Sequence, residues 1–208
     1  MPGRFITLEG GEGVGKSTQS RALAAALRAR GIDVVETREP GGSDGAEAIR
    51  RLLLEGSADR WNARAEALLF AAARADHVAR TIRPAIDAGR WVVCDRFLDS
   101  SIAYQGGADG LGDEAIRTLH AIGSAGYLPD RTLFLDMPVF DASFRQVAAG
   151  IANSDRFEKR DDAFHERVAA SFRRIARDEP GRVHTINAQG SPQEVTARLI
   201  EALADLLA

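Results

Sequence analysis

The sequence predicts an α/β fold in which a five-stranded, mostly parallel sheet is flanked by helices. Short β-rich runs alternate with helical stretches of about ten residues or more, the order that builds βα units. Two of the runs, residues 91–94 and 132–136, are apolar without alternation, as in strands buried on both faces. The chain has 208 residues, of which 45% are hydrophobic, so one domain over residues 1–208 can close a core.

Each expected element has a local reason. The strands are β-branched or apolar runs that end at glycine or polar residues, namely residues 5–9, 33–37, 91–94, 132–136 and 183–186. The helices carry apolar residues at helical spacing, namely residues 16–30, 46–55, 62–89, 113–123, 140–149, 162–177 and 192–207. Gly31 ends the first helix, Asn62 caps the long third helix, and Pro84 disturbs that helix. A glycine-rich loop is expected from Gly106 to Gly112.

Composition excludes several classes of protein. The formal net charge of −3 argues against a general nucleic-acid or membrane-surface binder. No apolar run approaches the ~20 residues of a membrane helix, and the first residues carry no signal-peptide pattern. Cys94 is the one cysteine and cannot form an internal disulfide, which favours a reducing compartment. We therefore expect a cytoplasmic protein with no nucleic-acid and no membrane partner.

Residues 10–17 fit the phosphate-loop pattern G-x-x-x-x-G-K-[ST] and lie between an expected strand and an expected helix. Glycines let successive backbone N–H groups face phosphate oxygens, and the helix N-terminus adds positive charge. Among 27 basic residues only Lys16 and Lys159 are lysines. Lys16 can reach the β and γ phosphates, and the Ser17 hydroxyl can bind Mg²⁺. The predicted triphosphate site comprises Gly10, Gly11, Glu12, Gly13, Val14, Gly15, Lys16, Ser17 and Thr18.

A second set of polar residues follows the strands, at the edge where open α/β sheets bind ligands. Arg38 follows the second strand and Arg96 the third, and each planar guanidinium can grip a phosphate. Asp95 ends the third strand, where a carboxylate beside a phosphate loop orients Mg²⁺ or its water. The alternative for Asp95 is a local turn cap. Asp136 also ends a buried strand and is interpreted as structural.

Phe70 and Arg74 share one face of the long helix because they are four residues apart. A ring that stacks on a base and a guanidinium that bonds the base edge would form a nucleobase reader. The alternatives are that Phe70 belongs to the core and that Arg74 is a solvated or ion-paired cation. His77 is interpreted as structural. The chain lacks the guanine-reading N-K-x-D sequence of GTPases.

Together these residues resemble the thymidylate kinase family, bacterial type, over essentially the whole chain. The matching segments are residues 5–18, T-R-E-P-G-G at 37–42, L-L-F-A-A-A-R at 68–74, D-R at 95–96, A-Y-Q-G at 103–106, L-F-L-D at 133–136 and D-R-F-E at 155–158. The resemblance implies a three-layer P-loop kinase fold. It also implies an enzyme that carries the γ-phosphate of ATP to dTMP with Mg²⁺, as a cytoplasmic homodimer.

The resemblance implies roles by position as well. The dTMP site would comprise Glu12, Arg38, Phe70, Arg74, Arg96, Ser101, Tyr104 and Gln105. In that set Phe70 stacks on thymine, Arg74 contacts the base edge, and Tyr104 crowds the 2′ position of the sugar. Arg38 and Arg96 hold the phosphate, and Glu12 helps to place the sugar or Mg²⁺. The catalytic residues would be Lys16, Asp95, Arg96 and Arg156, with Ser17 and Asp95 at the metal.

One departure from the family pattern concerns the lid, a mobile segment expected at about residues 145–160. Many bacterial members carry several arginines just before the D-R-F-E segment, whereas here Arg145 is the one arginine of residues 145–154. The cation that meets the transferring phosphate is then Arg145, Arg156, Lys159 or Arg160, with Arg156 preferred. Two alternatives remain open: another nucleoside monophosphate or deoxynucleoside kinase, and a nucleotide-binding switch.

Overall fold

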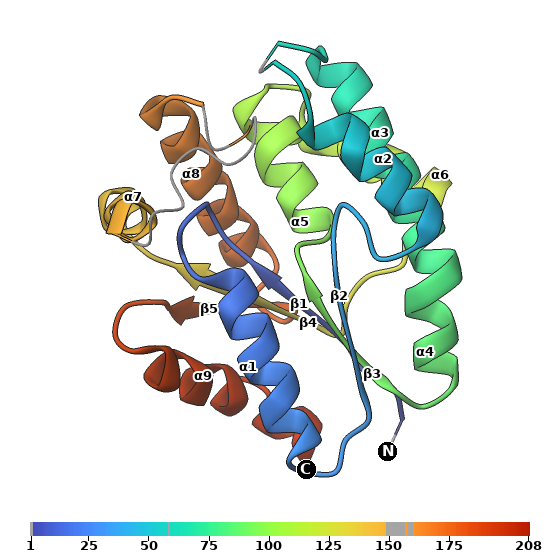
Figure 1. The fold of residues 1–208 in the computed structure, drawn as a ribbon, viewed down its shortest axis with the longest axis vertical. Helices are drawn as coiled ribbons and strands as arrows, with labels where there is room; N and C mark the ends of the chain where they lie inside the picture. Colours follow the sequence, from blue (N-terminus) through green and yellow to red (C-terminus); the bar gives the residue numbers. More distant parts are fainter. Residues whose placement is uncertain (1, 58, 149–156, 158–159) are drawn as a thin grey trace.

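A computed structural model describes residues 2–57, 59–148, 157 and 160–208 of the chain (Figure 1). The sheet has the strand order β2-β3-β1-β4-β5, and every pairing in the described residues is parallel. The strands are β1 (Phe5–Glu9), β2 (Val34–Arg38), β3 (Trp91–Asp95), β4 (Arg131–Asp136) and β5 (Val183–Asn187). The predicted α/β class with five strands is confirmed.

The helices alternate with these strands as predicted. They are α1 (Lys16–Arg28), α2 (Asp44–Leu54), α3 (Ala63–His77), α4 (Arg83–Asp87), α5 (Leu98–Ser101), α6 (Asp113–Ser124), α7 (Val139–Ala148), α8 (Asp162–Asp178), α9 (Pro192–Glu201) and α10 (Ala204–Leu207). Two π-helical segments, η1 (Val78–Ile82) and η2 (Ile102–Ala108), extend α3 and α5.

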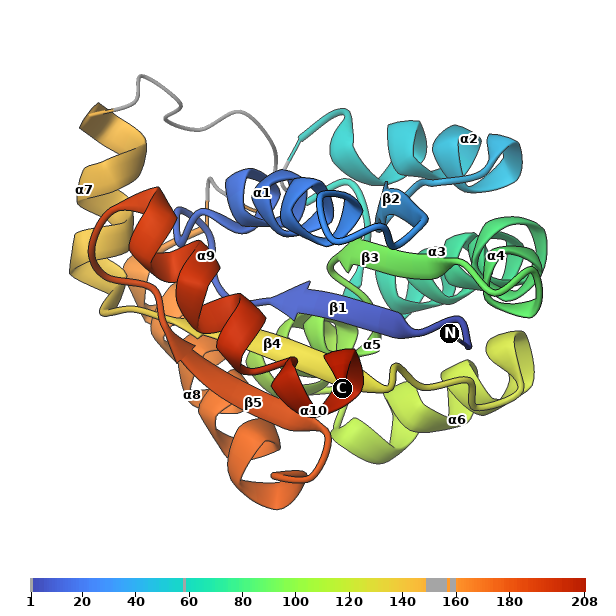
Figure 2. The ribbon, with the colours of Figure 1, turned by 90° about the horizontal axis from the view of Figure 1, so that it is seen from below.

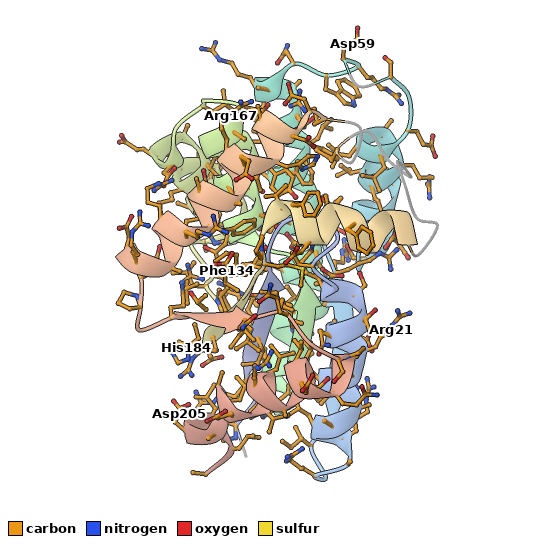
Figure 3. All side chains as sticks on the ribbon, turned by 90° about the vertical axis from the view of Figure 1, so that its left-hand side faces the viewer. Arg21, Asp59, Phe134, Arg167, His184 and Asp205 are labelled. Atoms are coloured by element: carbon orange, nitrogen blue, oxygen red, sulfur yellow. The ribbon has the colours of Figure 1, made fainter. Side chains whose placement is uncertain are left out.

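Successive residues of each strand face two different apolar layers. Ile6 and Val93 pack on one face of the sheet with α1 and α9. Phe5, Val92 and Phe134 pack on the other face with α3, α6 and α8. Phe134 lies in the interior of the molecule (Figure 3), and its ring centroid is 5.3 Å from that of a stacked α8 phenylalanine. Figure 2 shows α9 and α10 in front of the sheet and α8 behind it, so the sheet is the middle of three layers.

The helix expected over residues 62–89 is interrupted earlier than predicted. Asn62 caps it as expected, accepting a hydrogen bond from the Ala65 N–H at 2.9 Å. The interruption is the π-helical segment η1, in which the Arg83 N–H donates to the Val78 carbonyl. Because Pro84 has no N–H to donate, the turn before it can widen without losing a hydrogen bond.

Two further expectations are corrected. The loop predicted from Gly106 to Gly112 is helical at its start, because η2 continues to Ala108. A Cβ at Gly107 would overlap the Ser171 hydroxyl of α8, so this glycine permits close helix packing and does not mark a turn. The last predicted helix, over residues 192–207, is split into α9 and α10.

The parallel strands all end at one edge of the sheet, where β1 runs into the loop before α1. The two chain termini lie near one another at the lower end of the view in Figure 1. Within the described residues, no helix is both long enough and apolar enough to span a bilayer. The candidate residues at the carboxyl ends of β1, β2 and β3 are therefore brought to one edge of the fold.

Candidate active site

The loop between β1 and α1 presents Lys16 to a cavity. Gly10 has φ +142°, and a Cβ there would lie 2.6 Å from the Leu135 carbonyl oxygen, so this turn requires glycine. Lys16 is buried, and its Nζ donates to the Gly11 carbonyl at 2.5 Å. Burial and the nearby Arg96 lower the pKa of Lys16 to about 8. Because Lys16 is bonded to its own loop, its positive charge is already in place for an incoming anion.

Glu12 connects this loop to residues from a distant part of the chain. Its Oε1 accepts hydrogen bonds from Arg96 Nη2 at 2.7 Å and from the Tyr104 hydroxyl at 2.8 Å. Burial opposes the charge on Glu12, but Arg96 and Lys16 outweigh it and lower the pKa of Glu12 to about 2. Arg96 Nη1 also donates to the Gly10 carbonyl at 3.0 Å. The phosphate loop and the arginine after β3 are thus one bonded unit.

Glu9 supports Arg96 from behind, and the sequence analysis missed it. Arg96 has φ +70°, and its Nη1 donates to Ser100 Oγ at 3.1 Å. Ser100 Oγ in turn donates to Glu9 Oε2 at 2.5 Å, and Glu9 Oε1 accepts from the Phe97 N–H at 2.7 Å. Burial, together with the nearby Asp99, raises the pKa of Glu9 to about 7. The sequence did offer one signal: Glu9 is the last residue of β1, just as Asp95, the candidate metal ligand, is the last residue of β3.

Ser17 and Asp95 lie together beside the loop. Ser17 Oγ donates to Asp95 Oδ2 at 2.5 Å, whereas Asp95 Oδ1 is buried without a hydrogen-bond partner in the described part of the chain. Such an oxygen is costly unless a ligand satisfies it. Hydroxyl and carboxylate oxygens suit Mg²⁺, which usually keeps waters and binds substrate phosphates. No three His, Cys, Asp or Glu side chains among the described residues form a cage for a metal. The pair therefore fits a Mg²⁺ that arrives with a nucleotide.

Arg74 is buried, lines the same cavity and is fixed on several sides. Its Nε donates to Glu39 Oε2 at 2.7 Å, and its Nη2 donates to Ser101 Oγ at 2.8 Å and to the Phe97 carbonyl at 3.1 Å. His77 Nδ1 lies 3.0 Å from the other Glu39 oxygen, in agreement with the structural interpretation of His77. The Arg74 side chain is 3% exposed. The solvated alternative is therefore wrong, and Arg74 is an ion-paired cation that also lines the cavity.

Aromatic rings and an amide line the same cavity. The Phe70 ring centroid lies 5.8 Å from that of Phe157, which is itself 6.1 Å from the Tyr104 ring. Phe70 is only partly buried and lines the cavity, although it also packs against the core. Gln105 donates through Nε2 to Glu66 Oε1 at 2.9 Å, and both side chains are buried. Phe157 and Glu66 were not predicted; the D-R-F-E motif was the signal for the first, and nothing local marked the second.

One cavity of about 690 Å³ brings the predicted residues together. Those that line it are Glu12, Gly13, Gly15, Lys16, Ser17, Thr18, Arg38, Phe70, Arg74, Asp95, Arg96, Ser101, Tyr104 and Gln105. Gly10, Gly11 and Val14 shape the loop without being part of this lining, and Val14 packs into the core. Two basic residues of the lining were missed, Arg50 of α2 and Arg21, which stands on the outer side of α1 (Figure 3).

The remaining predicted cations have different surroundings. Arg38 Nη2 donates to Glu47 at 3.0 Å, and its side chain is 52% exposed. Arg156 and Lys159 lie outside the described residues, as does the side chain of Arg145. Arg160 Nη2 donates to Asp109 Oδ1, and the Arg160 guanidinium carbon lies 4.3 Å from the centre of the Phe164 ring. Among the four lid candidates, the structure therefore describes the side-chain contacts of Arg160 alone.

Comparisons with known proteins agree with this geometry. The sequence profile described as "Thymidylate kinase" matches residues 8–199. The chain is 92% identical over 207 residues to the thymidylate kinase of Rhizorhabdus wittichii, with 100% of both sequences covered. It is 50% identical over 208 residues to that of Chromohalobacter salexigens, with 100% of this chain and 98% of the relative covered.

A solved structure shows the same fold. The crystal structure of thymidylate kinase from Ehrlichia chaffeensis has a TM-score of 0.78 and 31% identity to this chain, with 98% of this chain and 100% of that chain covered. The predicted three-layer P-loop kinase fold is confirmed by this similarity and by the parallel sheet between two helical layers. A profile over most of the length, full-length relatives and a shared fold lead to one conclusion: this chain belongs to the thymidylate kinase family.

Proposed function

We propose that this chain is an enzyme that transfers the γ-phosphoryl group of ATP to dTMP and so forms dTDP. The observation that carries the proposal is the 690 Å³ cavity, whose lining includes both the phosphate loop and the side chains of Phe70, Arg74 and Tyr104. Glu12 and Arg96, bonded to each other at 2.7 Å, join the phosphate loop to the residues after β3 within this lining. Two nucleotides placed with their phosphates toward this pair would meet there.

The donor end is proposed to bind the triphosphate through the loop of residues 10–18. The glycine-rich backbone and the N-terminus of α1 supply N–H groups, and Lys16 supplies a positive charge. When phosphate oxygens approach, the Lys16 ammonium can exchange the Gly11 carbonyl for an anion. This exchange stabilises the charge that shifts toward the bridging oxygen during transfer.

The acceptor end is proposed to bind dTMP. Phe70 offers its ring to the base and Arg74 its guanidinium to the base edge, while Arg38 and Arg96 hold the phosphate. Tyr104, fixed by its bond to Glu12, would stand beside the sugar and disfavour a 2′-hydroxyl. Because the acceptor phosphate is already an anion, no strong general base is needed, and catalysis rests on position and charge.

Mg²⁺ is proposed to be held by Ser17 and Asp95, and the unpaired Asp95 Oδ1 supports this assignment. When bound, the ion neutralises phosphate charge. The Ser17 hydroxyl and the Asp95 carboxylate, at the end of β3, would hold the ion. Arg156 is proposed to add the lid cation, from a lid at about residues 145–160 of a single domain spanning residues 1–208. Lid closure would exclude the water that competes for the phosphoryl group.

The proposal is tested with an acceptor panel. ATP consumption is measured with dTMP, dUMP, dCMP, dAMP, dGMP and thymidine, each with and without Mg²⁺. We expect dTMP to be the best acceptor and turnover to depend on the metal. The Lys16→Ala variant should lose about 10²–10³-fold in turnover while its circular dichroism is unchanged. Best turnover with thymidine or with another monophosphate would favour the alternative kinases, and acceptor-independent hydrolysis would favour the switch.

A homodimer in the cytoplasm is proposed as the working form. Two exposed apolar side chains support the dimer, Leu68 on α3 with 57% exposure and Ile122 on α6 with 79%. These helices pack against each other, and a Cβ at Gly123 would lie 3.4 Å from the Ala71 carbonyl. Sedimentation velocity should show twice the monomer mass, and an Ile122→Glu variant should shift the equilibrium toward the monomer.

A further inference from the structure

Gln105 and Glu66 form a buried side-chain pair at the wall of the cavity. Gln105 of η2 is 1% exposed and Glu66 of α3 is 3% exposed. Gln105 Nε2 donates to Glu66 Oε1 at 2.9 Å. Gln105 lines the cavity, whereas Glu66 lies behind it and is not part of the lining. The bond to Gln105 therefore links Glu66 to the cavity.

The chemistry of Glu66 decides which end of the Gln105 amide faces the cavity. Gln105 Nε2 donates to Glu66 Oε1, so Glu66 is the acceptor and the NH₂ group of Gln105 points to it. The reversed amide would place an oxygen against a carboxylate oxygen in buried surroundings, which is costly. Gln105 Oε1 is left at the other end, without a hydrogen-bond partner in the described residues and not sealed from the cavity. The cavity is thereby given a fixed acceptor.

Arg74 supplies the neighbouring group, and it can only donate. Glu39 and Ser101 hold its guanidinium in place, so it cannot turn away from the cavity. The base edge therefore meets a donor from Arg74 and an acceptor from Gln105. Thymine and uracil present a carbonyl oxygen at C4 and a proton on N3, which match both groups. Cytosine presents an amino group at C4 and a bare N3, which oppose both.

We propose that Glu66 is a positioning residue that fixes the Gln105 amide and so makes the site select a pyrimidine with a protonated N3. The selection rests on the proposed function, which places the base in this cavity. Each like-to-like contact leaves a buried group without a partner and weakens binding about 10- to 100-fold. Arg74 alone would supply one of the two mismatches against cytosine. Glu66, through Gln105, supplies the other.

The test is the Glu66→Gln variant, which has nearly the same shape. An amide at position 66 can accept from Gln105 or donate to it, so both orientations of the Gln105 amide become available. Competitive inhibition constants of dCMP and KM values of dTMP and dUMP are measured for wild type and variant. We expect dCMP to bind about 10-fold more tightly than to wild type, with dTMP and dUMP changed less than about threefold. A structural role alone would weaken all three nucleotides together.

The double variant Glu66→Gln/Gln105→Glu is the matched control. It keeps one carboxylate and one amide in the same space, but the group next to the base can now only accept. We expect wild-type discrimination against dCMP to return, and this variant also carries the test if Glu66→Gln does not fold. The same dTMP:dCMP ratio in all three proteins would overturn the inference. Failure of wild type to phosphorylate dTMP would instead overturn the proposed function, so the two failures are distinguishable.

Discussion

Removal of the Arg74 guanidinium should affect stability and substrate selection by different amounts, and both can be worked out from its contacts. The Arg74→Met variant keeps an apolar stem of similar length. It leaves the Glu39 carboxylate, which is 4% exposed, without its partner at 2.7 Å. Breaking a buried pair in this way costs about 3–5 kcal/mol. For a chain of 208 residues, each kcal/mol lowers the melting temperature by about 2–4 °C. The expected shift is therefore about 6–20 °C.

A second substitution separates the charge of Glu39 from the packing of Arg74. In Glu39→Gln/Arg74→Met the uncompensated charge is gone, so about 1–3 kcal/mol of the loss should be recovered. Calorimetry of the wild type, both single variants and the double variant gives this coupling energy directly. Strictly additive effects would contradict the assignment of Arg74 as the partner that offsets the Glu39 charge.

The catalytic consequence is measured below the melting temperature of the weakest variant. Both variants lack a charged donor at the base edge, so the KM for dTMP should rise about 10- to 100-fold. The KM for ATP should stay within a factor of about two, because the hydrogen bonds of Arg74 in the described residues go to Glu39, Phe97 and Ser101 and not to the phosphate loop. An equal rise in both KM values would show that Arg74 acts through the scaffold and does not read the base.

Three further predictions follow from the titrating and metal-facing groups. Because the pKa of Lys16 is lowered to about 8 in the free protein, ATP affinity should be flat below that pH and fall about tenfold per unit above it; a pH-independent Kd up to pH 9.5 would contradict this. The pKa of Glu9 is raised to about 7, so the folded state holds this proton more tightly than the unfolded state. The free energy of unfolding should therefore fall by about 3 kcal/mol between pH 4.5 and 7. Urea titrations should show this slope in wild type and lose it in Glu9→Gln. The Asp95→Asn variant should need about tenfold more Mg²⁺ for half-maximal turnover, read from a Mg²⁺ titration at fixed ATP.

The fold was predictable because its signals are local. The strands are short runs that begin with β-branched or apolar residues, or centre on them, and the phosphate loop combines glycines, Lys16 and Ser17 within eight residues. The π-helical segments were not predictable in the same way. They depend on Pro84 removing one donor and on a helix packed closely against Gly107, which only the assembled structure shows.

Most of the residues that line the candidate site could be predicted from the sequence. The buried residues that support them from behind could not. The buried residues Glu9, Glu39 and Glu66 were not predicted, because the role of each depends on a hydrogen-bond partner that is far away in the sequence. Glu39 meets Arg74 across 35 positions and Glu66 meets Gln105 across 39. The periodicity of apolar residues indicates which face of a helix or strand is buried, but it does not indicate which buried polar side chains will bond to each other.

The bonds that Arg96 and Lys16 make to adjacent carbonyls of one loop have a thermodynamic consequence. Arg96 is bound to the Gly10 carbonyl and Lys16 to the Gly11 carbonyl, so neighbouring carbonyls hold the cation proposed for the acceptor site and the cation proposed for the donor site. A nucleotide that draws either cation away changes the hydrogen bonding of the peptide next to the other. We therefore expect the proposed donor and acceptor sites to be coupled through these two peptides, and reciprocity then requires each substrate to alter the other's affinity by the same factor.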